Sequence, residues 1–151
     1  MKWMEYKKTL TEFVKFLILP NITSEQPKEN IDKMDTRIFQ LCEQLSENLA
    51  HNWTLEEMAK AINASESHFI KLFKNATGNP PIAWLRDERL KEACKLLEGD
   101  WEHINHIALK VGMPNESHFT RDFKNKYGLT PTAYRKQYWD KKQAERLLEQ
   151  K

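Results

Sequence analysis

The chain contains 151 residues, with 24 Lys and Arg against 22 Asp and Glu and a formal net charge of +2. This length is enough for one domain with a core that folds alone, and so small a net charge does not by itself indicate a polyanionic partner. No apolar run is long enough for a transmembrane helix, and Lys7 and Lys8 interrupt the apolar residues that a signal peptide would require. We therefore expect a cytoplasmic protein with no membrane partner.

Apolar residues recur at spacings of three and four, and only four glycines and six prolines interrupt the chain. This pattern predicts an all-α fold. The first apolar stripe predicts an amphipathic helix over 3–18 that ends before Pro20, followed by a polar linker over 20–33. This helix is expected either to pack on its own domain, or to form a homodimer contact or remain from a removed sensor domain. The first 33 residues are too few for a ligand-binding barrel.

The middle of the chain carries local signals for two further helices. Asp35 is the expected N-cap of a helix that ends near His51. Thr54 and Glu57 have the spacing of a capping box, which predicts a short helix through Ile62.

A tight turn and five more helices follow. Asn63 is expected to make the turn, because Asn tolerates the left-handed conformation, and Gly112 holds the equivalent place later in the chain. The predicted helices cover 65–77, capped by Ser65 and stopped by Gly78; 82–97; 103–111; 115–127, capped by Asn115; and a last segment from Pro131 through Leu148. The apolar side of the 82–97 helix is expected to contain Ile82, Leu85, Leu90, Ala93, Cys94 and Leu97.

Residues 66–81 and 116–131 repeat one pattern without a gap, with nine identities in sixteen positions. So many identities indicate two copies of one supersecondary unit. The identical residues of the first copy are Glu66, Ser67, His68, Phe69, Phe73, Lys74, Asn75, Gly78 and Pro81.

Several motifs in a fixed order resemble the DNA-binding domain of AraC/XylS-type transcription regulators. The resemblance covers about residues 34–137. Met113 departs from the Phe that the family usually has at its position, a change that a core can repack around. The motifs, in chain order, are Trp53-Thr54-Leu55-Glu56-Glu57-Met58-Ala59, Gly78-x-x-Pro81, Arg89-Leu90-x-x-Ala93-x-x-Leu96-Leu97, Ile107-Ala108-x-x-Val111-Gly112-Met113, Ser117-His118-Phe119-x-x-x-Phe123 and Gly128-x-x-Pro131-x-x-Tyr134-Arg135.

The resemblance implies an all-α, homeodomain-like tandem of two helix–turn–helix subdomains joined by a linker helix, with an extra N-terminal amphipathic helix. Each subdomain would present its second helix, near 65–77 and 115–127, to a major groove of double-stranded DNA. The expected divisions are 1–33 (amphipathic helix and linker), 34–137 (DNA-binding domain, with units 34–81 and 101–137 and linker helix 82–97) and 138–151 (helical tail).

Helical periodicity separates a core face from an open face on each recognition helix. Phe69, Leu72, Phe73 and Ala76 fall on one side of the first, as do Phe119, Phe123 and Tyr127 of the second. The open faces carry residue types that suit DNA, because Arg and Lys reach guanine acceptors and Ile packs on a thymine methyl. The candidate DNA-binding residues are Ser67, Ile70, Lys71, Lys74, Glu116, Ser117, His118, Thr120, Arg121 and Lys124.

Simpler interpretations compete for several of these residues. A Lys on a solvated face usually makes no specific contact, so Lys74 and Lys124 are interpreted as phosphate contacts rather than base readers. His68 and His118 lack the clustered third ligand that a metal site needs, which favours packing or a phosphate contact. An acid such as Glu116 more often caps a helix than bonds a cytosine.

No catalytic or cofactor-binding pattern is evident. We find no nucleophile–base pair, phosphate loop or metal-ligand spacing, so we expect no enzymatic activity, metal or cofactor. Cys42 and Cys94 are interpreted as small core residues.

The sequence therefore predicts a sequence-specific transcription regulator, an activator that works beside RNA polymerase. The alternative is a degenerate helix–turn–helix module that binds RNA polymerase or another regulator without reading DNA. Charge differs between the halves, because residues 34–100 carry 8 basic against 11 acidic side chains and residues 101–151 carry 10 against 6. We expect the second unit to supply most of the non-specific affinity for DNA. The first unit should contribute mainly register on the duplex and discrimination between sequences.

Overall fold

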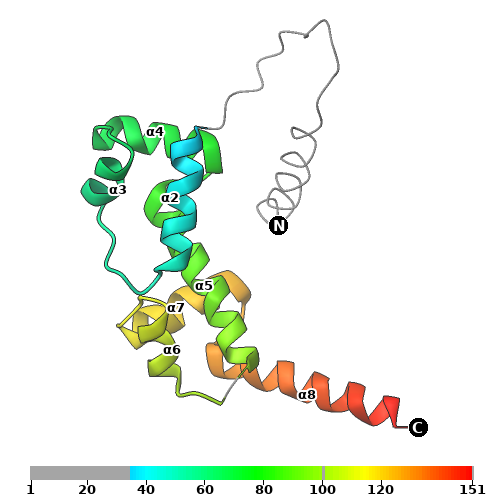
Figure 1. Cartoon of the computed structure of the whole chain (residues 1–151). Helices are drawn as coiled ribbons and strands as arrows, with labels where there is room; N and C mark the ends of the chain where they lie inside the picture. Colours follow the sequence, from blue (N-terminus) through cyan, green and yellow to red (C-terminus); the bar gives the residue numbers. More distant parts are fainter. Residues whose placement is uncertain (1–34, 100, 151) are drawn as a thin grey trace, which may run out of the picture. The chain divides into compact units, whose positions relative to one another are not determined.

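The computed structural model describes residues 35–99 and 101–150, and in these ranges every regular element is an α-helix (Figure 1). The expected helix over 3–18 and the linker over 20–33 lie outside the described residues. The helices are α2 (Thr36–Glu47), α3 (Leu55–Ala61), α4 (Glu66–Thr77), α5 (Pro81–Gly99), α6 (Ile104–Lys110), α7 (Glu116–Tyr127) and α8 (Pro131–Glu149).

The first unit consists of α2, α3 and α4, and side-chain caps set the starts of these helices as predicted. Asp35 accepts from the Arg37 N–H, the Thr54 hydroxyl accepts from Glu57 N, and Ser65 accepts from His68 N. Gly78 ends α4 in the left-handed conformation, with φ of 82°. Each cap satisfies a backbone group that the end of a helix leaves without an intrahelical partner.

The core of the first unit forms between α2, α3, α4 and the start of α5. Phe69 and Phe73 are fully buried, and the ring of Phe73 meets that of Trp84 edge to face at 5.6 Å. Trp84 is buried, although it was not among the expected core residues of the linker helix. Ile82 was among them, but it is 39% exposed. The helix starts at Pro81, and its buried side there runs through Pro81, Trp84 and Leu85.

Two local predictions for the first unit need correction. Helix α2 ends at Glu47 rather than near His51, because side chains bind the next carbonyl groups: Arg89 donates to Leu49 O and His51 O, and Trp53 Nε1 donates to Asn48 O. The capping box is only half formed. The Glu57 carboxylate lies 2.8 Å from His51 Nε2 instead of completing the box at Thr54.

The second unit consists of α6, α7 and the first turns of α8, and it repeats the first. Asn115 caps α7 by accepting from His118 N at 2.9 Å, and Gly128 ends it with φ of 76°. Phe123 meets Tyr134 edge to face at 5.4 Å, as Phe73 meets Trp84 fifty residues earlier. The start of α8 therefore supports α7 in the way that the start of α5 supports α4.

The turns of the two units differ in length by one residue. Residues 62–65 separate α3 from α4, whereas residues 111–115 separate α6 from α7. Asn63 and Gly112 both have a positive φ, of 55° and 78°, as the sequence predicted. A Cβ atom on Gly112 would overlap the carbonyl oxygen of Leu49 and lie 3.0 Å from guanidinium nitrogens of Arg89. The second turn thus packs against the backbone that follows α2.

Helix α5 links the two units by contacts on both sides (Figure 1). It contacts α2 and α4 of the first unit and α6 and α8 of the second. Two ion pairs join it to α7, between Arg86 and Asp122 at 3.6 Å and between Asp87 and Lys126 at 2.8 Å. The predicted all-helical tandem with a linker helix is confirmed for the described residues.

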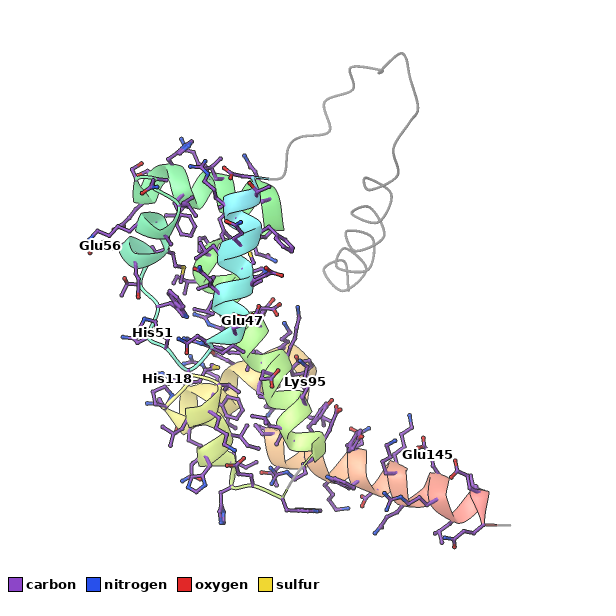
Figure 2. The ribbon with its side chains drawn as sticks, in the orientation of Figure 1. Glu47, His51, Glu56, Lys95, His118 and Glu145 are labelled. Atoms are coloured by element: carbon purple, nitrogen blue, oxygen red, sulfur yellow. The ribbon has the colours of Figure 1, made fainter. Side chains whose placement is uncertain are left out.

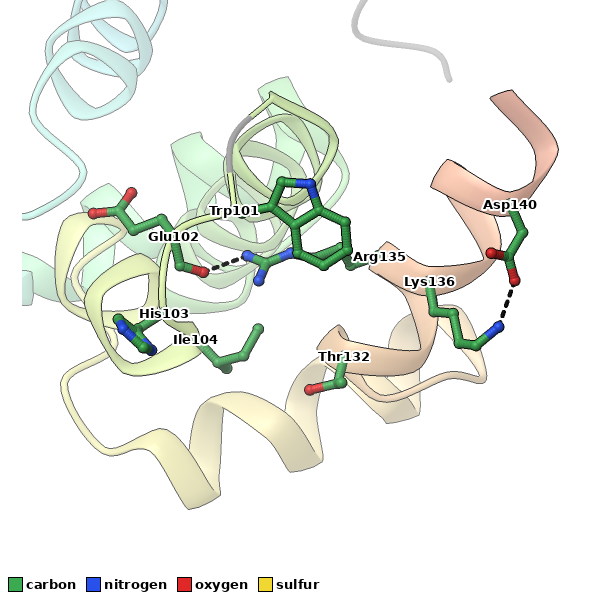
Figure 3. Close-up of a pocket in the computed structure, with 8 residues that line it drawn as sticks. All are labelled: Trp101, Glu102, His103, Ile104, Thr132, Arg135, Lys136 and Asp140. Atoms are coloured by element: carbon green, nitrogen blue, oxygen red, sulfur yellow. Dashed lines mark hydrogen bonds and ion pairs between the residues drawn. The ribbon is translucent and has the colours of Figure 1, made fainter. Parts of the chain in front are cut away.

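Helix α8 is anchored at its start and exposed toward its end. The Arg135 guanidinium lies 5.7 Å from the centre of the Trp101 ring and donates through Nη2 to Glu102 O at 2.6 Å (Figure 3). Trp101 also stacks on Trp139 at 6.3 Å. Beyond these contacts all side chains from 140 to 149 are exposed, including Glu145 (Figure 2). Within the described residues, no helix is both long and apolar enough to span a bilayer.

Candidate nucleic-acid interface

The second helix of the first unit, α4, presents a polar face opposite its buried phenylalanines. Ser67, Lys71 and Lys74 are exposed, and Ile70 is half-buried. The other two members of the expected core stripe, Leu72 and Ala76, are also half-buried. The four predicted DNA-binding residues of α4 therefore share one accessible side, with Ile70 at its edge.

The equivalent helix of the second unit, α7, carries a shallow open depression. Thr120 is half-buried, and His118 is exposed (Figure 2). The depression is lined by Glu116, Ser117, Thr120, Arg121 and Lys124. Five of the six candidate residues predicted on α7 thus line one concave surface.

The lysines and the arginine of these faces differ in their surroundings. In the described part of the chain, Lys71, Lys74 and Lys124 have no carboxylate partner, and all three are exposed. Arg121 is paired: its Nε donates to Asp122 Oδ1 at 3.1 Å, and its Nη2 lies 3.1 Å from the same oxygen. The lysines are free to follow a phosphate, whereas the Arg121 guanidinium has a fixed neighbour.

Asp122 is a residue of this site that the sequence reasoning did not identify. Its side chain is 15% exposed and also lies 3.6 Å from the Arg86 Nε of α5. The repeat contained a signal, because Asp122 aligns with the apolar Leu72 of the first copy. A carboxylate that is largely buried needs a compensating positive charge. Arg86 and Arg121 provide it for Asp122.

The N-terminal ends of both helices are already capped. Ser65 and Asn115 bind the free N–H groups, so Glu66 and Glu116 occupy the first turn as exposed acids rather than as N-caps. Their charge is favourable near the positive end of a helix dipole. Glu116 remains available to accept from a base donor at the edge of the depression.

Among the described residues, no group of three or more His, Cys, Asp or Glu side chains could hold a metal ion. Cys42 is buried in the first unit, and burial raises the pKa of its thiol to about 12. A thiol so protonated is a packing group, as the sequence predicted.

Comparisons with known proteins agree with this architecture. A family model described as a helix-turn-helix domain matches residues 58–137. The HTH-type transcriptional regulator AlkR of Acinetobacter baylyi is 36% identical over 85 residues, 56% of this chain and 28% of AlkR. The regulatory protein PocR of Salmonella typhimurium is 34% identical over 118 residues, 78% of this chain and 37% of PocR. The chain spans 28% to 45% of the length of the curated relatives that it matches.

Solved structures show the same fold. The DNA-binding domain of AdpA, in complex with a target DNA, matches with a TM-score of 0.68 at 25% identity, covering 70% of this chain and 95% of that domain. A DNA-binding transcriptional dual regulator from Escherichia coli matches with a TM-score of 0.62 at 28% identity, covering 79% of this chain and 99% of that protein.

Proposed function

The chain belongs to the AraC/XylS-type family of helix–turn–helix transcription regulators, and from this premise we propose that it binds specific DNA sequences and regulates transcription. In this proposal α4 and α7 enter successive major grooves of one duplex. The observation that carries it is that the predicted DNA-contacting residues lie on one accessible face of α4 and one of α7, each opposite two buried phenylalanines.

The side chains of the two faces suit different parts of the duplex. Arg121 presents a planar fork that matches the O6 and N7 acceptors of guanine, and Ile70 can pack on a thymine methyl. Lys74 and Lys124, which stand one turn further along their helices, suit phosphate oxygens. Ser67, Ser117 and Thr120 add short hydroxyl groups that bond either backbone or base.

Regulation is proposed as activation beside RNA polymerase. The exposed surfaces beyond the two recognition faces, such as the outer part of α8, leave room for a protein partner while DNA is bound. A homodimer through the 3–18 helix is also proposed, because that segment has an apolar stripe at helical spacing. Sedimentation at micromolar concentration tests the dimer, and a monomer throughout would refute it.

The DNA-reading proposal is tested by selecting bound duplexes from a genomic library at about 150 mM salt, where non-specific binding is weakened. We expect the full chain to enrich two half-sites about 10 base pairs apart. A Lys71→Ala/Arg121→Ala protein should lose this motif. The matched control is Lys95→Ala/Lys141→Ala, which removes two exposed positive charges from α5 and α8 and should retain the motif.

The other outcomes separate the alternative function. If the full chain enriches no motif, or if the double variant on the recognition helices retains DNA equally, the groove-facing assignment is wrong. The chain would then be an interaction module for RNA polymerase or another regulator. Binding of purified polymerase without DNA would be the positive evidence for that function.

A further inference from the structure

We infer that Asp122 is a positioning residue, which holds the guanidinium of Arg121 in the orientation that reads guanine and makes the second unit the more discriminating of the two. The inference rests on the proposed function and names the base class that α7 reads. It begins from the one recognition-face cation that has an ion-pair partner.

The geometry of the pair leaves one edge of the guanidinium available. Arg121 meets Asp122 Oδ1 through Nε and Nη2, each at 3.1 Å, so the carboxylate occupies the side edge of the fork. A guanidinium has five N–H donors in a fixed plane. The end edge, formed by Nη1 and the second hydrogen of Nη2, remains free to bond O6 and N7 of a guanine.

A second arginine, from outside α7, also approaches the carboxylate. Arg86 of α5 lies 3.6 Å from Asp122 Oδ2, on the opposite oxygen from the one that Arg121 meets. The Asp122 side chain is 15% exposed while that of Arg121 is 61% exposed, so the anion is sheltered and the cation projects into solvent. The arrangement restricts the rotamers of Arg121 before DNA arrives, which lowers the entropy lost on binding.

The first unit supplies an internal comparison. Its aligned residues are Lys71 and Leu72, a flexible ammonium beside a half-buried aliphatic side chain. An ammonium can also reach O6 and N7 of guanine, but its three donors rotate on a flexible stem, so it loses more conformational freedom per hydrogen bond than a held, planar guanidinium does. On this inference base discrimination belongs to the second unit, which is the opposite of the sequence-based expectation that the first unit provides it.

The decisive experiment compares sequence selection by the full chain with that of Asp122→Leu, which copies the first unit, and Asp122→Asn, which retains an acceptor oxygen. We expect the preference for guanine at the α7 half-site to fall about fivefold to tenfold in Asp122→Leu and less in Asp122→Asn, because one oriented bidentate contact is weakened. The preference at the α4 half-site should stay unchanged. Affinity for random duplex should rise, since a negative charge has been removed.

Control variants distinguish this role from simpler ones. Asp140→Asn removes one exposed negative charge from α8 and should change no base preference. If Asp122→Leu raises affinity for all sequences equally and leaves guanine preference intact, Asp122 acts only by charge and the inference is refuted. Loss of selection at both half-sites together with a lower melting temperature would show a structural role and refute it as well. If the unsubstituted chain selects no motif, the proposed function fails first and the inference falls with it.

Discussion

The turns of the two helix–turn–helix units meet the same backbone requirement with different residues. In the first unit Asn63 takes the left-handed conformation and its side chain is exposed. In the second, Gly112 takes it where a Cβ would overlap Leu49 O. Both turns need a residue that tolerates positive φ, but their neighbours differ: Arg37 of the same unit donates to Ile62 O in the first turn, whereas Leu49 and Arg89 approach Gly112 in the second. The copies have therefore diverged where one unit touches the other, and have stayed alike in the caps and aromatic pairs that each needs for itself.

The largest expected effect tests this close approach. Gly112→Ala should destabilise the protein by about 1–2 kcal/mol from the left-handed backbone and by about a further 1–3 kcal/mol from overpacking. Gly128→Ala is the matched control, because Gly128 has nearly the same φ, of 76°, and open space around its Cβ position. Urea unfolding of both variants measures the difference. Equal losses would show that the contact between the units contributes nothing.

The second prediction compares the two recognition helices. Arg121→Ala should weaken binding to the selected motif by about 1–3 kcal/mol, the range for one bidentate base contact. Lys71→Ala should cost less, because a single flexible ammonium discriminates poorly. Titration of each protein with the motif and with a random duplex measures both quantities. A larger specific loss for Lys71→Ala would reverse the assignment of discrimination.

A smaller effect is expected from the phosphate contacts. Lys124→Glu should reduce affinity for random DNA more than Lys74→Glu does, because the second unit is basic and the first is acidic. The slope of log binding constant against log salt concentration reports the number of phosphate contacts. Loss of one contact should reduce the magnitude of this slope by about 0.9. Titrations at several salt concentrations measure this slope. A greater effect at Lys74 would show that the net charge of a unit does not decide which unit binds the DNA phosphates more strongly.

The smallest expected effect concerns alkaline pH. The second unit has Tyr134 where the first has Trp84, and burial, followed by its hydrogen bond to Glu98, raises the pKa of this phenol. Because the folded state keeps the proton that the unfolded chain releases near pH 10, stability is fully present below that pH and falls as pH rises above it. Tyr134→Phe should make the melting temperature less sensitive to pH between about pH 9.5 and about pH 11.5, the range that begins where the phenol of the unfolded chain ionises. An unchanged pH dependence would contradict the contribution of Tyr134.

Local signals predicted most of the helices, because caps and stops depend on near neighbours. Ser65, Asn115 and Gly78 act where the sequence placed them. The errors arise from side chains that find distant partners. Arg89 binds carbonyl groups 38 and 40 residues away and so shortens α2.

The candidate interface shows the same difference between features set by near neighbours and features set by distant partners. Periodicity was enough to place Ser117, Arg121 and Lys124 on one face, since all three belong to one helix. It could not identify Asp122 as part of the site, because the ion pair with Arg86 depends on how α5 packs beside α7. Contacts between helices need the tertiary arrangement, which hydrophobic spacing alone does not specify.

The Arg89 side chain also bears on how the chain folds. It starts from α5, donates to Leu49 O and His51 O, and lies beside the place of Gly112 in the second turn. Opening either unit would therefore expose a guanidinium and two carbonyl groups that the other unit helps to cover. We therefore expect the two copies of the repeat to unfold together as one cooperative unit, so that removing either half would destabilise the other.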